Sequence, residues 1–151
     1  MFGKTPVSEQ GYQFRSNVWM WEPLWRYCEE IAPDLVPADN LGHSSDGWGL
    51  NERDALFLAE RLDDALASGK VRQHEERHKA RLAALPPEPC ILCGGTGRRA
   101  QAFRANPGAL LCKVCGGTGL VANSETNFLF STENVREFVT FLWSCGGFQI
   151  H

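Results

Sequence analysis

The sequence contains no long apolar run and no strong excess of charge of either sign. No stretch reaches the roughly 18 consecutive apolar residues that indicate a transmembrane helix, and residues 1–6 lack the apolar core of a signal peptide. The net charge of −3 is too small to predict a general attraction to nucleic acid or to an acidic membrane. We therefore expect a cytoplasmic protein that does not bind membranes.

The composition is typical of a folded protein. Hydrophobic residues make up 43% of the sequence and charged residues 22%, which excludes a disordered chain. A length of 151 residues fits one domain with room for a small inserted module.

Cysteine is the residue type with the clearest pattern. Four of the six cysteines form two Cys-x-x-Cys pairs, Cys90 with Cys93 and Cys112 with Cys115. In a reducing compartment, such pairs indicate metal binding rather than disulfides. The other two, Cys28 and Cys145, lie on apolar helical stripes, so we expect them to be buried as small hydrophobic residues.

Each pair opens the same eight-residue repeat, Cys-x-x-Cys-Gly-Gly-Thr-Gly, at residues 90–97 and 112–119. Four thiolates in such an arrangement suit one tetrahedral zinc ion. The glycines permit positive φ angles, which lets backbone amides approach the sulfur atoms. We predict one structural zinc ion held by two zinc knuckles, in a β-hairpin that turns at residues 106–108.

Residues 90–119 resemble the cysteine-rich zinc domain of DnaJ-type co-chaperones, which carries repeats of Cys-x-x-Cys-x-Gly-x-Gly. The resemblance implies a zinc-binding knuckle. Two repeats are present where the family has four, which implies one zinc rather than two, and the chain has no His-Pro-Asp tripeptide, the J-domain signature. The flanks, at residues 14–19 and 144–148, are similar to small uncharacterised proteins of bacteria and their phages.

Hydrophobic periodicity predicts an α+β core over residues 1–89 and 123–151, into which residues 90–122 are inserted as a four-cysteine zinc ribbon. Short strands are predicted at residues 12–21, 128–130 and 148–150. Helices are predicted at residues 23–32, 52–67, 70–85 and 132–145. Asn51 and either Ser131 or Thr132 are the expected N-caps, and Gly146-Gly147 is expected to end the last helix.

One motif favours an enzyme: His-Glu-x-x-His, formed by His74, Glu75 and His78. It resembles the zinc metalloprotease motif, in which two histidines bind a metal and the glutamate acts as a general base. However, the intervening residues Glu76 and Arg77 are charged, and the terminal His151 is the only later histidine. We therefore expect a solvated or half-buried helix face.

Charge is distributed unevenly along the chain. Residues 1–89 carry a net charge of −5 and residues 123–151 carry −2, whereas residues 90–122 carry +4 and no acidic residue. The four basic residues of this segment are Arg98, Arg99, Arg104 and Lys113. They are candidates for salt-dependent contacts with phosphates, and otherwise form a solvated face.

Five tryptophans are many for this length. Trp25 and Trp143 are predicted to lie on helices in the core, and Trp19 and Trp21 on one face of the first strand. Trp48 follows in a glycine-rich loop. Burial in the core is the general expectation, although exposed tryptophans often anchor partners.

The sequence thus predicts a small zinc-binding protein that acts as a non-catalytic binding module, with another protein as the expected partner. A zinc ribbon that binds RNA or DNA is the first alternative. A metal hydrolase that uses His74, Glu75 and His78 is the second. The oligomeric state is left open.

Overall fold

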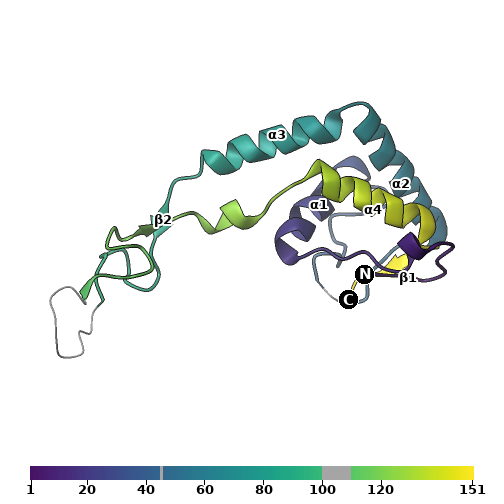
Figure 1. The fold of residues 1–151 in the computed structure, drawn as a ribbon. Coiled ribbons are helices and arrows are strands. Elements are labelled where there is room, and N and C mark those ends of the chain that lie inside the picture. Colours follow the sequence, from purple (N-terminus) through teal and green to yellow (C-terminus); the bar gives the residue numbers. More distant parts are fainter. Residues whose placement is uncertain (45, 100–109) are drawn as a thin grey trace. The chain divides into compact units, whose positions relative to one another are not determined.

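The computed structural model describes residues 1–44, 46–99 and 110–151 (Figure 1). The longer elements among these residues are the helices α1 (Val18–Ile31), α2 (Glu52–Ala67), α3 (Lys70–Ala83) and α4 (Thr132–Ser144). The shorter ones are β1 (Phe2–Gly3), η1 (Glu9–Gly11), β2 (Glu88–Pro89), β3 (Leu120–Val121), η3 (Ser124–Asn127) and β4 (Phe148–Gln149). The predicted α+β fold is therefore mostly helical in its described part, with small two-stranded sheets.

The chain divides into two compact units. Unit 1 consists of residues 1–80 and 128–151, and unit 2 consists of residues 81–127. Unit 2 includes the predicted insertion at residues 90–122 together with the residues that adjoin it. No helix in the described part of the chain is long and apolar enough to cross a membrane.

Side-chain caps begin three of the helices of unit 1. Asn17, Asn51 and Ser131 each accept a hydrogen bond from a backbone N–H three residues further on, which satisfies a donor that the helix itself leaves unpaired. The predicted caps at Asn51 and Ser131 are confirmed. After α4, Gly146 and Gly147 adopt positive φ angles of 59° and 85°, as predicted for the end of this helix.

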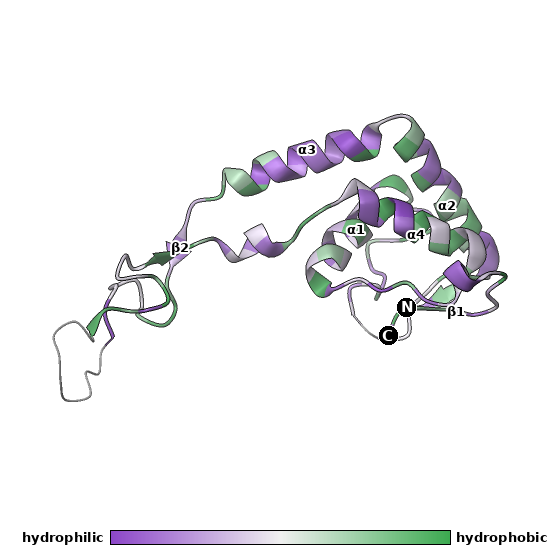
Figure 2. Cartoon of the chain, viewed as in Figure 1, coloured by the Kyte–Doolittle hydropathy of each residue, from purple (hydrophilic) through white to green (hydrophobic). Residues whose placement is uncertain are grey.

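The core of unit 1 is formed by the apolar faces of α1, α2 and α4. Helix α2 packs mainly against α4, and β1 and β4 form an antiparallel pair in which Gly3 lies opposite Phe148. Helix α3 is hydrophilic along most of its length (Figure 2). Cys28 and Cys145 are fully buried, as predicted, and burial raises the pKa of both thiols.

The prediction of a strand at residues 12–21 is wrong, because α1 begins at Val18. Pro23 lies inside this helix rather than in its first turn. A proline has no N–H to donate to the carbonyl four residues earlier, and that carbonyl belongs to Trp19. The backbone N–H of Leu129 donates to the Trp19 carbonyl instead, at 3.0 Å. A contact distant in sequence thus compensates for the proline.

Residues 128–130 do not form the predicted strand either. Besides the bond from Leu129 to α1, the segment is fixed by the ring of Phe130, which is 3% exposed. This ring packs against Tyr27 and His74, with ring centroids 5.2 and 4.6 Å away. The segment is therefore held by α1 and α3 and not by a neighbouring strand.

Trp19 and Trp21, predicted to lie on a strand, belong to α1, and of the two tryptophans predicted to lie on helices in the core only one is buried. Trp25 is fully buried, as predicted, and its Nε1–H donates to Asn40 Oδ1 at 2.8 Å. Two further tryptophans pack against its ring, Trp21 and Trp48. Trp143, predicted to be in the core, is 42% exposed, and its Nε1–H donates to Asp63 on α2 at 2.9 Å.

Candidate metal centre

The two eight-residue repeats of unit 2 contact each other reciprocally. The N–H of Cys90 donates to the carbonyl of Gly119 at 2.8 Å, and the N–H of Cys112 donates to the carbonyl of Gly97 at 2.9 Å. Each repeat is thus tied at its first residue to the last residue of the other. Antiparallel pairing flanks the repeats on both sides, through β2 with β3 and through a bridge between Arg98 and Leu111.

This arrangement brings together the four cysteines predicted to bind metal. The sulfur atoms of Cys90, Cys93, Cys112 and Cys115 all lie within 4.8 Å of one another. Two distances between the repeats, Cys90 Sγ to Cys112 Sγ and Cys93 Sγ to Cys115 Sγ, are both 3.8 Å. A tetrahedral site with metal–sulfur bonds of about 2.3 Å has edges of about 3.8 Å. These two distances match the edges of a tetrahedral site, so the cluster is a candidate site for one metal ion.

The glycines of each repeat have the role that the sequence predicts. Gly97 and Gly119 adopt φ angles of 71° and 79°. Their backbone N–H groups donate to the sulfur atoms of Cys93 and Cys115, each at 3.3 Å. Such bonds stabilise a thiolate and orient it toward a metal.

The thiols of the cluster differ in acidity. Burial acts to raise the pKa of Cys115, but hydrogen bonds from the amides of Gly119 and Gly117, together with those from the thiols of Cys112 and Cys93, lower this pKa to about 7. The pKa of Cys90 is raised to about 11, mainly by burial. Four thiolates this close together would repel one another, and a divalent metal ion would supply the compensating charge.

The predicted basic residues lie around this cluster as far as the structure describes them. Arg98, Arg99 and Lys113 are exposed. Arg104 and the predicted turn at residues 106–108 lie outside the described residues. The described basic side chains are therefore accessible to a partner.

Sequence reasoning did not single out the aliphatic residues between the paired cysteines. We define residues 91–92 and 113–114 as the knuckle tips. Ile91 is 93% exposed, Leu92 61% and Val114 58%. Their position between the two cysteines of a pair is the sequence pattern that could have predicted this exposure. A loop of only two residues encloses no interior in which a side chain could be buried.

The residues of the His-Glu-x-x-His motif bind other parts of unit 1. Glu75 accepts bonds from the backbone N–H and the hydroxyl of Thr132, the first residue of α4, and pairs with Lys79. The ring of His74 packs on Phe130, and His78 Nε2 lies 2.6 Å from the carbonyl of Phe128. Within the described ranges, the only group of three or more ligand atoms close enough to share a metal is the cysteine cluster.

We predict that Glu75→Gln lowers the unfolding free energy of unit 1 by about 1 kcal/mol, because the neutral amide can still accept a bond from Thr132 but loses the added strength of a charged acceptor and the ion pair with Lys79. Bonds from Lys79 and Thr132 lower the pKa of Glu75 from 4.5 to about 2. A depressed folded-state pKa stabilises the fold above the unfolded-state value and loses that effect as the pH falls. The difference between wild type and variant should therefore shrink between pH 4.5 and pH 2.

The measurement is denaturant unfolding followed by tryptophan fluorescence, which reports on unit 1 because all five tryptophans lie there. Glu76→Gln is the matched control, since Glu76 is exposed on the same helix. An equal effect of both substitutions, or a difference that does not depend on pH, would refute the capping role of Glu75.

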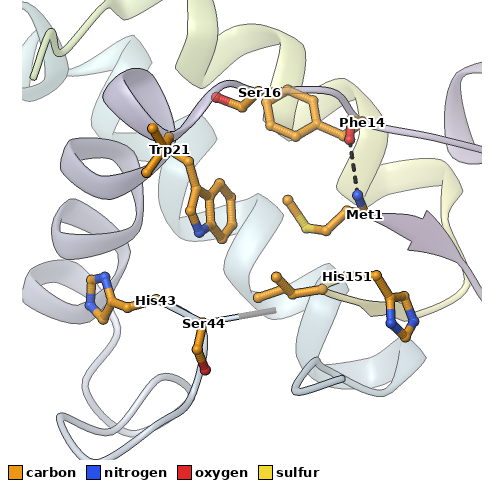
Figure 3. Close-up of a pocket in the computed structure, with 9 residues that line it drawn as sticks. Met1, Phe14, Ser16, Trp21, His43, Ser44 and His151 are labelled. Atoms are coloured by element: carbon orange, nitrogen blue, oxygen red, sulfur yellow. Dashed lines mark hydrogen bonds between the residues drawn. The ribbon is translucent and has the colours of Figure 1, made fainter. Parts of the chain in front are cut away.

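Unit 1 also contains a cavity of about 180 Å³. Its walls are formed by Met1, Phe14, Ser16, Val18, Trp21, His43, Ser44, Ile150 and His151 (Figure 3). Two of its polar groups are already engaged. The Met1 amino group donates to the Phe14 carbonyl, and the ring nitrogens of His43 bond to Glu22 and Glu29 at 2.7 and 2.9 Å. The cysteine cluster is therefore the stronger candidate for a functional site.

Comparison with protein-family models, curated proteins and solved structures gives no match to this chain. No family can be assigned on that basis. The four-cysteine cluster and the surface around it are therefore the features from which a function is argued.

Proposed function

We propose that the protein holds one structural zinc ion at Cys90, Cys93, Cys112 and Cys115 and acts as a non-catalytic module that binds another protein. The observation that carries this proposal is the exposure of aliphatic side chains at the knuckle tips. Reduced thiols at this site require a reducing compartment, so we place the protein in the cytoplasm.

The donor set supports zinc and argues against catalysis. Four thiolates at tetrahedral spacing are typical of structural zinc, whereas a catalytic zinc keeps one position open for water or substrate. Here all four positions would be taken by sulfur. The resemblance to the zinc domain of DnaJ-type co-chaperones agrees with a knuckle of this kind.

The surface of unit 2 favours a protein partner over a nucleic acid. Binding of single strands relies on aromatic side chains that stack on bases, and unit 2 contains one aromatic residue, Phe103, which lies outside the described residues. Exposed aliphatic side chains instead suit the apolar centre of a protein interface. The exposed Arg98, Arg99 and Lys113, in a segment without acidic residues, keep nucleic acid as the second candidate.

Photo-cross-linking in the native host tests the choice of partner. A benzophenone amino acid replaces Ile91, which is 93% exposed, or Val7, which is 78% exposed and lies in unit 1. We expect discrete protein adducts from position 91 that disappear when Cys93→Ser is added, and none from position 7.

Digestion of the adducts separates the two candidate functions. Adducts that a protease removes and a nuclease leaves intact support the proposal. Adducts removed by nuclease would favour the nucleic-acid function instead. Absence of any adduct at position 91, or equal adducts at both positions, would overturn the proposal.

A further inference from the structure

The knuckle tips are not needed to hold unit 2 together. Its buried cluster consists of Cys90, Cys112 and Cys115, with Cys93 and Val121 packed against it. The aliphatic side chains of the tips remain outside this cluster. Zinc coordination, rather than packing of these side chains, would supply the folding energy of such a module.

The two tips occupy equivalent places in the repeats. Leu92 and Val114 both precede the second cysteine of a pair, and Ile91 and Lys113 both follow the first. Each tip lies between two cysteines whose sulfur atoms contact the other repeat at 3.8 Å. The cluster thus presents the two tips as a matched pair of short loops.

The charged side chains of residues 90–122 are all basic. Arg98 bridges to Leu111, the residue before Cys112, and the charge of +4 exceeds the −2 that four thiolates and one zinc ion would add. Arg98 and Arg99 directly follow the first repeat, Lys113 lies in the second tip, and all three are exposed. Residues 90–122 contain no acidic residue, whereas residues 1–89 and 123–151 are both net negative. A partner with acidic groups would be attracted to this surface, and a basic partner would be repelled.

We propose that the knuckle tips bind a protein segment that combines acidic with aliphatic side chains. This inference rests on the proposed function and names the chemistry of its partner. The aliphatic side chains of the segment contact Leu92 and Val114, and its carboxylates pair with Arg98, Arg99 and Lys113. Binding weakens as salt concentration rises, because the ion pairs lie at an exposed rim.

Selection of peptides tests this partner chemistry directly. The zinc-loaded full chain is used to select random peptides displayed on phage, and one enriched peptide is synthesised with a fluorescent label. We expect the enriched sequences to combine Asp or Glu with Leu, Ile or Val. Fluorescence anisotropy then gives the affinity of the labelled peptide for wild type and variants at several salt concentrations.

Two paired variants and their controls locate the binding surface. Leu92→Ser with Val114→Ser, and separately Arg98→Glu with Arg99→Glu, should each weaken binding by about tenfold or more while the chain keeps its zinc. Leu129→Ser, at a leucine that is 52% exposed in unit 1, should leave the affinity unchanged. So should Arg72→Glu with Arg77→Glu, which makes the same charge change on α3.

Several results would overturn the inference. The selection would overturn it if it enriched basic or uncharged peptides, or enriched no peptide. The affinity measurement would overturn it if the knuckle-tip variants bound the selected peptide as tightly as wild type. Adducts of the chain with itself at position 91 would identify a second copy as the occupant and also overturn it. The proposed function fails separately, if cross-linking at position 91 captures nucleic acid or no partner.

Discussion

Removal of the metal is expected to unfold residues 90–99 and 110–122 and to leave the helices of unit 1 folded. Structural zinc contributes about 10–16 kcal/mol of apparent folding free energy in isolated finger peptides. The described part of unit 2 has a buried cluster made of the cysteines and Val121, so little apolar packing would remain without the metal. Unit 1 has its own core, which includes Trp25, Phe138 and Leu58.

Hydrogen exchange with and without a strong chelator measures this difference. Protection should be lost in residues 90–99 and 110–122 and retained in α2 and α4. Tryptophan fluorescence should not change, because no tryptophan lies in unit 2. Loss of protection in α2 and α4 would show that the two units fold together and that the division into core and insertion is wrong.

Measurement of the zinc content of purified variants identifies the metal ligands. The purified chain should carry one zinc, and Cys93→Ser should lose it. His74→Ala serves as the control, because its ring packs on Phe130 and Tyr27 rather than on the cysteine cluster. Retention of zinc by Cys93→Ser together with its loss from His74→Ala would reject the assignment.

The sequence correctly predicts those parts of the structure that depend on residues close together in the sequence. The caps at Asn51 and Ser131 and the glycines after α4 depend on residues a few positions apart. The knuckles likewise follow from the spacing within each repeat, and their duplication indicates that the two pairs form one site.

The errors arise where a distant segment supplies a missing partner. The start of α1 is predicted as a strand because apolar and polar residues partly alternate over residues 12–21, and the N–H that compensates for Pro23 inside the helix comes from the distant Leu129. Nothing near Glu75 in the sequence indicates that its carboxylate caps α4 at Thr132. The exposure of Ile91 and Leu92 follows from their place in the short loop between two clustered cysteines and not from their hydrophobicity.

Gly97→Ala is expected to lower zinc affinity by about tenfold to a hundredfold, the range found when groups that support metal ligands are removed. A Cβ at this position would overlap the carbonyl oxygen of Gly117. The repeats would have to move apart, which displaces the Gly97 N–H from Cys93 Sγ, now 3.3 Å away. Competition with a chelator of known zinc affinity measures the effect.

Gly94→Ala is the control that separates the steric overlap at position 97 from the energetic cost of placing an alanine at a positive φ angle. Gly94 also has a positive φ, 58°, but no atom lies within 4 Å of a Cβ built there. An alanine in the left-handed region costs about 1–2 kcal/mol at either site. Only the variant at Gly97 adds the clash between the repeats, so its zinc affinity should be clearly the lower of the two.

The reciprocal contacts extend the comparison to the second repeat. A Cβ on Gly119 would overlap the carbonyl oxygen of Gly95, whereas one on Gly116 would meet no atom within 4 Å. Gly119→Ala should therefore reduce zinc affinity as strongly as Gly97→Ala, and Gly116→Ala as mildly as Gly94→Ala. If all four variants lost zinc affinity equally, backbone strain alone would account for the glycines that the two repeats share, and the close approach between the repeats would not support the metal site.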